Sequence, residues 1–201
     1  MVYDKAGIHD SIKGQGHWPE TDETPTLTLF LQNLEDRSLR RVKQLGIVGV
    51  SMGHLDTGGL ETWTDENLKR HMDRVAEADL ELRNIMFDPG ERIIFAQPGR
   101  DEDIETVINA IQVAGRQGLP VMEYNFYAHR IVEGYKVVPG RGGSRLMDFN
   151  NDRIKDLPPL TGKSAHSLDE MWDNVTYYLK AVIPAAEEAN VRLALHPNDP
   201  P

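Results

Sequence analysis

Short apolar runs and longer amphipathic stretches alternate along most of the chain. The apolar runs contain many Leu, Val, Ile and aromatic residues and lie between polar or glycine-containing segments, which is typical of buried strands. The sequence therefore predicts five strands, at Thr26–Asn33, Ile47–Met52, Glu81–Phe87, Pro120–Ala128 and Val191–Leu195.

The stretches between these runs have helical periodicity, with apolar residues recurring three or four positions apart. Four helices are predicted, at Glu35–Gly46, Thr64–Leu80, Asp101–Gly118 and Ser167–Asn190. The last has the clearest start, because Ser167 and Glu170 have the spacing of a capping box. Pro184 lacks a backbone N–H, so the helix is expected to kink or restart there.

Strands that alternate with helices predict an α/β fold with a parallel sheet and right-handed crossovers. An open doubly wound sheet and a (β/α)8 TIM barrel both fit this alternation. No G-x-G-x-x-G motif follows the first strand and no P-loop is present, which disfavours a nucleotide-binding sheet. The sequence favours an incomplete TIM barrel with about five of the eight β/α units.

Two segments depart from the alternation. Residues 1–25 predict an N-terminal loop-like segment rich in glycine and charge, followed at 26–201 by the N-terminal part of the barrel. A polar excursion at about 129–166 is too long for a simple loop and predicts a functional insertion or a short subdomain. Within it, Arg141 and Arg145 flank glycines and either bind a carboxylate or phosphate or lie in a flexible, solvated loop.

The composition narrows the classes of partner. Lys and Arg number 22 and Asp and Glu number 32, giving a net charge of −10. A negative chain without a basic run argues against a nucleic-acid partner. No apolar stretch is long enough to span a membrane, and the start lacks the apolar middle of a signal peptide, so a soluble cytoplasmic protein is expected. The absence of cysteine excludes disulfides and thiolate ligands within these residues.

Polar side chains stand where three of the predicted strands end. His54 follows the second strand, Glu123 and Asn125 share one face of the fourth strand with Tyr127, and His196 follows the fifth. Active sites of parallel α/β folds lie at the C-terminal ends of their strands. Glu123 and Asn125 need partners or a ligand there, because unpaired buried polar groups are costly.

Each of these residues also has a purely structural interpretation. His54 fits a hydrogen-bonded rim residue, Asn125 fits a residue that ties down a loop, and Glu123 fits an ion pair facing a surface helix. His196 is better placed for function, since prolines stiffen the following turn and imidazole is the commonest metal ligand. The other histidines, including His71 in the second helix, are expected to be solvated.

The C-terminal stretch, DNVTYYLKAVIPAAEEANVRLALHPNDPP, is the most specific part of the sequence. It resembles the mannonate dehydratase family, metal-dependent sugar-acid dehydratases with a xylose-isomerase-like TIM barrel. The family's LKAIIPVAEE-like helix end and its HPDDPP strand end correspond to Leu179–Glu188 and His196–Pro201. The YNF sequence of Tyr124–Phe126 resembles the family's fourth-strand motif, and His54 matches a family histidine more loosely. The similarity covers most of the chain from about Thr26.

The resemblance implies that His196 is the first ligand of a divalent metal, Mn2+ or Fe2+. It also implies that the family's remaining ligands, a cysteine, a histidine and an aspartate, lie beyond Pro201. The chain is then expected to be the N-terminal part of a larger enzyme and to have little activity alone. Asn198 stands where the family usually has aspartate, and Glu123 departs from the family pattern.

The implied reaction removes water from D-mannonate to give 2-keto-3-deoxy-D-gluconate, a step of hexuronate catabolism. The substrate-binding residues expected from the resemblance are His54, Asn125, Arg130 and Asp199. The catalytic acid and base are not assigned. The partner is a small sugar acid, and no nucleic acid or membrane is involved.

Two other interpretations remain open. A sugar isomerase or epimerase on the same barrel would let Glu123 join the metal site. A catalytically silent truncated barrel would act only as a folded remnant or assembly piece. An incomplete barrel also leaves strand edges open, which favours aggregation or formation of a homo-oligomer.

Overall fold

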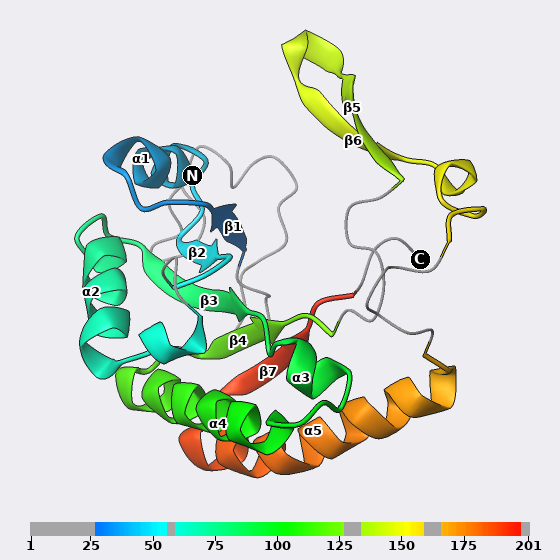
Figure 1. The fold of residues 1–201 in the computed structure, drawn as a ribbon. Helices are drawn as coiled ribbons and strands as arrows, with labels where there is room; N and C mark the ends of the chain where they lie inside the picture. The colour runs from blue at the N-terminus through cyan, green and yellow to red at the C-terminus, as the bar shows by residue number, and fades with distance from the viewer. Residues whose placement is uncertain (1–26, 56–58, 127–133, 159–165, 198–201) are drawn as a thin grey trace, which may run out of the picture.

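Five parallel strands form the central sheet of the protein. The computed structural model describes residues 27–55, 59–126, 134–158 and 166–197. The strand order is β1-β2-β3-β4-β7, and every neighbouring pair is parallel (Figure 1). The bounds of these strands are β1 (Thr28–Leu31), β2 (Gly49–Met52), β3 (Glu81–Phe87), β4 (Val121–Tyr124) and β7 (Arg192–Leu195).

The strand order decides between the two architectures that fit the sequence. A doubly wound sheet reverses its strand order at a switch point, with helices on both faces. Here the strands follow one another in chain order without a reversal, and α2, α4 and α5 lie along the same side of the sheet in Figure 1. The fold is an α/β fold whose five parallel strands form an incomplete (β/α)8 barrel.

The predicted helices are present with slightly shifted ends. Their bounds, with those of a short additional helix α3, are α1 (Asp36–Gln44), α2 (Asp65–Ala76), α3 (Glu91–Ile94), α4 (Arg100–Gln117) and α5 (Leu168–Ala189). Three 3-10 turns occupy Leu60–Thr62, Arg141–Gly143 and Asn151–Arg153. Gly118 ends α4 with a φ of 78°, a left-handed conformation that glycine adopts without strain.

The fifth helix confirms the predicted capping box and contradicts one of the two effects expected of Pro184, a restart of the helix. Ser167 and Glu170 form the predicted capping box, with the Ser167 N–H 2.7 Å from Glu170 Oε2 and the Glu170 N–H 3.2 Å from Ser167 Oγ. The helix does not restart at Pro184 and continues to Ala189. Because Val182 and Ala186 are buried on either side of the proline, packing holds the helix together across the missing hydrogen bond.

The hydrophobic core lies between the sheet and its helices. From the strands, Val50, Ile85 and Met122 are fully buried and point toward the helical layer. Helical residues with the same full burial pack against them: Leu68, Val75, Val107, Ile111, Tyr178 and Val182. Among the described residues, no helix is both long enough and apolar enough to cross a membrane.

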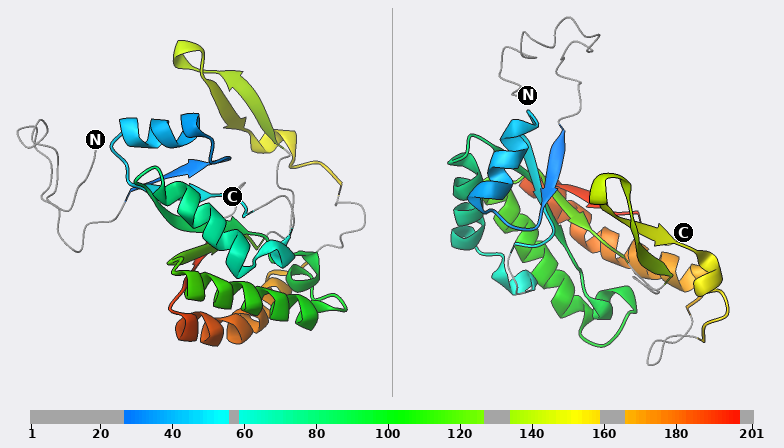
Figure 2. Two further views of the ribbon diagram at one scale, coloured as in Figure 1. Left: turned by 90° about the vertical axis from the view of Figure 1, so that its left-hand side faces the viewer. Right: turned by 90° about the horizontal axis from the view of Figure 1, so that it is seen from above.

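An antiparallel hairpin occupies part of the predicted excursion. Its strands are β5 (Tyr135–Pro139) and β6 (Arg145–Phe149), and it stands clear of the parallel sheet in Figures 1 and 2. Gly142 and Gly143 turn the chain at the tip with φ angles of 66° and 80°. The glycine-rich segment therefore forms the tip of a hairpin, with Arg141 and Arg145 exposed there. The N-terminal segment 1–25 lies outside the described residues, as do 129–133 and 159–165 of the excursion.

Candidate active site

The face of the sheet opposite the helices carries polar side chains toward the C-terminal ends of the strands. Successive residues of a strand point to opposite faces, so Asn84 and Glu123 face away from the helices that bury Ile85 and Tyr124. The register supports this arrangement, because Met86 on β3 pairs with Glu123 on β4. We call this the inner face, since it would line the interior of a closed barrel.

Glu123 joins three neighbouring strands on the inner face. Its Oε1 lies 2.6 Å from Nδ1 of His196, and its Oε2 accepts a hydrogen bond from Nδ2 of Asn84. The backbone N–H of His196 donates to the carbonyl oxygen of Tyr124 at 2.9 Å. This hydrogen bond extends the pairing of β4 with β7 and fixes the position of His196 beside Glu123. The expectation that Glu123 pairs toward a surface helix is wrong, because its partners come from β3 and from the end of β7.

Asn125 and Asn84 each carry a buried amide oxygen that finds no partner among the described residues. Asn125 Nδ2 donates to Sδ of Met86 at 3.5 Å, but its Oδ1 accepts no hydrogen bond from a described residue. The same is true of Asn84 Oδ1. Buried polar atoms are nearly always paired in folded proteins. Because no described residue donates to them, these two oxygens on the inner face are suited to accept hydrogen bonds from hydroxyl groups of a ligand.

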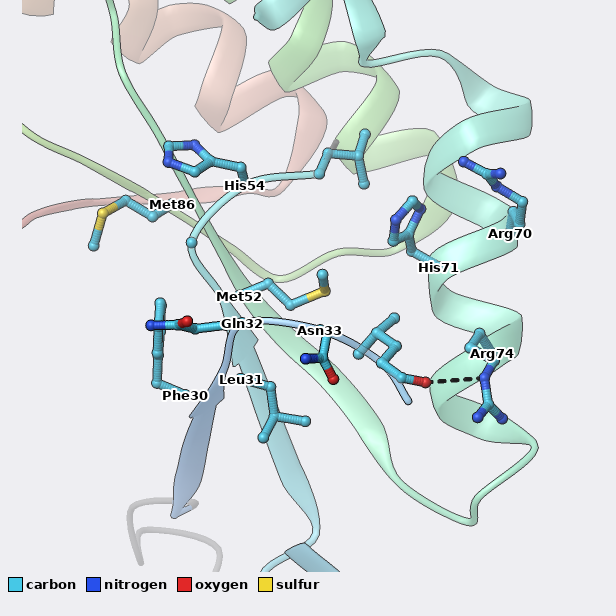
Figure 3. Close-up of a pocket in the computed structure, with 13 residues that line it drawn as sticks. Phe30, Leu31, Gln32, Asn33, Met52, His54, Arg70, His71, Arg74 and Met86 are labelled. Carbon is cyan, nitrogen blue, oxygen red and sulfur yellow. Dashed lines mark hydrogen bonds between the residues drawn. The ribbon is translucent and has the colours of Figure 1, made fainter. Parts of the chain in front are cut away.

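A pocket of about 830 Å³ lies at the C-terminal ends of β1, β2 and β3. Figure 3 shows His54 and Met86 on one side of the end of β2, and His71, Arg70 and Arg74 of α2 on the other. Met86 lines the pocket and also contacts Asn125. The pocket therefore adjoins the polar cluster of the inner face, which consists of Asn84, Glu123, Asn125 and His196.

Two pocket residues were not expected to take part in a site. His71 is half-buried, and its Nδ1 lies 2.9 Å from the carbonyl oxygen of Asn67, so the expectation of a solvated histidine is wrong. Arg74 donates from Nε to the carbonyl oxygen of Leu34 at 3.1 Å (Figure 3). The signal that could have found them is their spacing, since residues 70, 71 and 74 lie on one side of the amphipathic helix α2.

Three of the predicted site residues lie within the described part of the chain. His54 is exposed at the rim of the pocket, whereas Asn125 and His196 are part-buried on the inner face. Arg130 and Asp199 lie outside the described residues. Burial raises the pKa of the Tyr124 hydroxyl on β4, so this phenol stays neutral at physiological pH.

His196 fits one position of a metal site. Its Nδ1 contacts Oε1 of Glu123 at 2.6 Å, which leaves Nε2 as the ring nitrogen that can bind an ion. A complete site needs three or more protein ligands. Within the described ranges, no group of three or more His, Cys, Asp and Glu side chains comes together to hold an ion. One ligand fits here, and a complete ligand set is not found in this part of the chain.

Comparison with known proteins shows the family. The family model described as D-mannonate dehydratase (UxuA) matches residues 26–167 and 161–201. This chain belongs to the mannonate dehydratase family. The match covers β1 through β7, so the polar cluster and the pocket both lie within the part of the chain that the family shares.

Individual mannonate dehydratases support the assignment. The Streptococcus pneumoniae enzyme is 30% identical over 192 residues, and the match covers 82% of this chain and 52% of that protein. The Thermotoga maritima enzyme is 29% identical over 198 residues, covering 82% and 55%. The crystal structure of mannonate dehydratase from Streptococcus suis superimposes with a TM-score of 0.75 at 27% identity, covering 87% of this chain and 54% of that one.

The chain spans about half the length of the curated relatives it matches. A more distant structural relative, D-psicose 3-epimerase from Clostridium cellulolyticum H10, superimposes with a TM-score of 0.52 at 10% identity. At that identity the likeness shows the barrel fold alone.

Proposed function

We propose that the protein dehydrates a sugar acid, converting D-mannonate to 2-keto-3-deoxy-D-gluconate and water, and that this chain supplies part of the active site. The observation that carries the proposal is the position of His196 at the end of β7, in contact with Glu123 and within the residues 161–201 that the family model matches. This contact leaves one imidazole nitrogen available as a metal ligand, beside two amide oxygens that accept no hydrogen bond from the described residues.

The reaction demands stabilisation of negative charge. The hydrogen on C2 is weakly acidic beside a carboxylate, and the hydroxyl on C3 must leave as water. A divalent metal, Mn2+ or Fe2+, would supply the positive charge that stabilises the substrate oxygens when C2 loses its proton. His196 would hold that metal through Nε2, and ligands outside the described residues would complete its coordination.

The other inner-face residues would position the substrate. The Oδ1 atom of Asn125 accepts no hydrogen bond from a described residue, so it is suited to accept one from a hydroxyl of the sugar acid. His54 stands at the pocket rim, where a neutral imidazole can donate to or accept from the substrate. We assign Arg130 and Asp199 to substrate contacts on the same proposal. The proposal also includes a cytoplasmic location and a homo-oligomeric state.

Metal removal tests the proposal. The protein, expressed from its complete reading frame, is treated with a chelator, reloaded with Mn2+ or Fe2+, and assayed for 2-keto acid formation from D-mannonate. D-Gluconate, which differs in configuration at C2, is the matched control substrate. We expect activity to be lost on chelation and restored by metal, with a much weaker response to D-gluconate.

A variant separates binding from folding. His196→Ala should keep the circular dichroism spectrum of the wild type and lose metal-dependent activity. Activity that persists after chelation, or that survives in His196→Ala, contradicts the proposal. Mn2+-dependent conversion of a ketose in place of the aldonate would favour the isomerase alternative, and binding of the aldonate without turnover would favour a silent barrel.

A further inference from the structure

Glu123 is held at both of its carboxylate oxygens. Oε1 contacts Nδ1 of His196 at 2.6 Å, and Oε2 accepts from Nδ2 of Asn84. The Glu123 side chain is 21% exposed and the His196 side chain 37%, so the carboxylate is the better shielded of the two groups. Partial burial makes a hydrogen bond electrostatically stronger than it is in open water.

The contact with His196 determines which ring nitrogen carries hydrogen. A neutral imidazole has one N–H donor and one acceptor nitrogen. Because the carboxylate only accepts, the hydrogen belongs on Nδ1 and the lone pair on Nε2. We propose that Glu123, oriented by Asn84, is a positioning residue that fixes the Nδ1–H tautomer of His196 and presents Nε2 to the metal. This inference rests on the proposed role of His196 as a metal ligand.

A direct role of Glu123 as a ligand fits the structure less well. A ligating carboxylate needs at least one oxygen directed at the ion, and both oxygens of Glu123 already face hydrogen-bond partners. Carboxylates that accept from the second nitrogen of a ligating histidine are a recurrent feature of metal sites. In this chain three neighbouring strands supply the arrangement: Asn84 from β3, Glu123 from β4 and His196 from the end of β7.

The tautomer of His196 can be measured without metal. The protein from the complete reading frame is labelled with 15N-histidine, and long-range 1H–15N correlation spectra report which ring nitrogen is protonated. The signal of His196 is assigned by its absence in His196→Ala. We expect the Nδ1–H form in the wild type and a shift of population toward Nε2–H in Glu123→Ala. Glu105→Ala, which removes an exposed carboxylate on α4, is the matched control and should leave the signal unchanged.

Metal affinity provides the second readout. The dissociation constant of Mn2+ is measured by electron paramagnetic resonance of the free ion. Loss of a residue that orients a metal ligand typically weakens binding by about 10–100-fold, and we expect an increase of that size for Glu123→Ala. Asn84→Ala should weaken Mn2+ binding by less, because the carboxylate keeps its contact with His196. Glu123→Gln preserves side-chain shape, so it tests the same contact if Glu123→Ala does not fold.

The outcomes separate this inference from the proposed function. If His196→Ala binds Mn2+ as tightly as the wild type, the proposed ligand and this inference both fail. If His196→Ala loses Mn2+ but the Glu123 variants keep both tautomer and affinity, only the positioning role is overturned. A fall in affinity without a change of tautomer would make Glu123 a direct ligand and would also overturn the positioning role.

Discussion

The two faces of the parallel sheet differ in burial and polarity. The outer face, which the helices cover, consists of fully buried apolar residues such as Val50, Ile85 and Met122. The inner face carries Glu123 and His196, which remain part-exposed and are bonded to each other. A strand presents its residues alternately to the two faces, so a single strand serves both purposes.

The two faces therefore contribute differently to stability and to ligand binding. Burial of apolar area on the outer face supplies the favourable free energy of folding. Polar groups of the inner face lose hydrogen bonds to water on folding. This free-energy cost is offset only where they find other hydrogen-bond partners. Asn84 and Asn125 each carry an amide oxygen there that accepts no hydrogen bond from the part of the chain that the structure describes, and a ligand that paired with them would offset this cost. The inner face is therefore expected to be stabilised by its substrate and the outer face by its own packing.

Loss of a fully buried side chain is expected to have the largest effect on stability. Ile85→Ala should lower the free energy of unfolding by about 2–5 kcal/mol, since it opens a cavity at a fully buried position. Met86→Ala changes the next residue, which lies on the part-exposed inner face. It should lower the free energy of unfolding by about half as much as Ile85→Ala or less. Urea denaturation of the two variants measures both values. Equal losses would show that the inner face is packed as tightly as the outer face.

Tyr178, on helix α5, is a buried residue of the helical side that carries a polar group. Its side chain is fully buried, with its ring centroid 5.6 Å from that of Tyr124 and 6.0 Å from that of Phe126. Its hydroxyl makes no hydrogen bond to the part of the chain that the structure describes, and burial raises its pKa. Tyr178→Phe removes an unpaired polar group and keeps the ring. It should leave the free energy of unfolding unchanged or raise it by up to about 1 kcal/mol.

Thermal unfolding of Tyr178→Phe tests whether the buried hydroxyl stabilises the protein. Tyr178→Ala is the control, because loss of the whole ring should cost about 3–5 kcal/mol. If Tyr178→Phe is itself destabilised by more than about 1 kcal/mol, the hydroxyl has a partner that outweighs its burial. The helical layer would then contain polar pairing comparable with that of the inner face.

The main elements of the fold could be predicted because both periodicities are strong in this chain. Runs such as Ile47–Met52 and the capping box at Ser167 are local signals, and the structure confirms both. The choice of a barrel over an open sheet could not be made from the periodicity, since both have the same alternation of elements. Strand order settles it, and that order depends on contacts between distant segments.

The hairpin of β5 and β6 was missed for a physical reason. Val137, Leu146 and Met147 are all about half-exposed or more, so neither strand has a buried face to impose an apolar-polar alternation. The short helix Glu91–Ile94 is a single turn and too brief to show a period.

The candidate site could be predicted in part. The rule that function gathers at strand ends identified Asn125 and His196, and the structure places both on the inner face. The partner of Glu123 was not identified, because His196 lies 73 residues further along the chain. Their contact depends on the register of β4 against β7, in which Glu123 pairs with Ala194. No local pattern encodes that register.

The smallest expected effect concerns an exposed ion pair that joins two helices of the outer layer. Arg116 on α4 donates to the carboxylate of Asp65 at the start of α2, with a shortest contact of 2.8 Å. The hydrogen bonds from Arg116, and then from Gln117, lower the pKa of Asp65 from 3.8 to about 2. A lowered carboxyl pKa stabilises the folded state above the unfolded value, and this contribution disappears as the pH falls from about 4 toward 2 and below.

Asp65→Asn should therefore unfold at a slightly lower temperature than the wild type above pH 4, and the difference should narrow steadily toward pH 2. Glu66→Gln, which changes the neighbouring exposed carboxylate, is the matched control and should show no such narrowing. Thermal unfolding followed by circular dichroism between pH 6 and pH 2 measures the effect. A difference that stays constant across this range would mean that Asp65 contributes through packing and not through its charge. Because both partners are exposed to water, the effect should also shrink as salt is added, whereas the loss in Ile85→Ala should not.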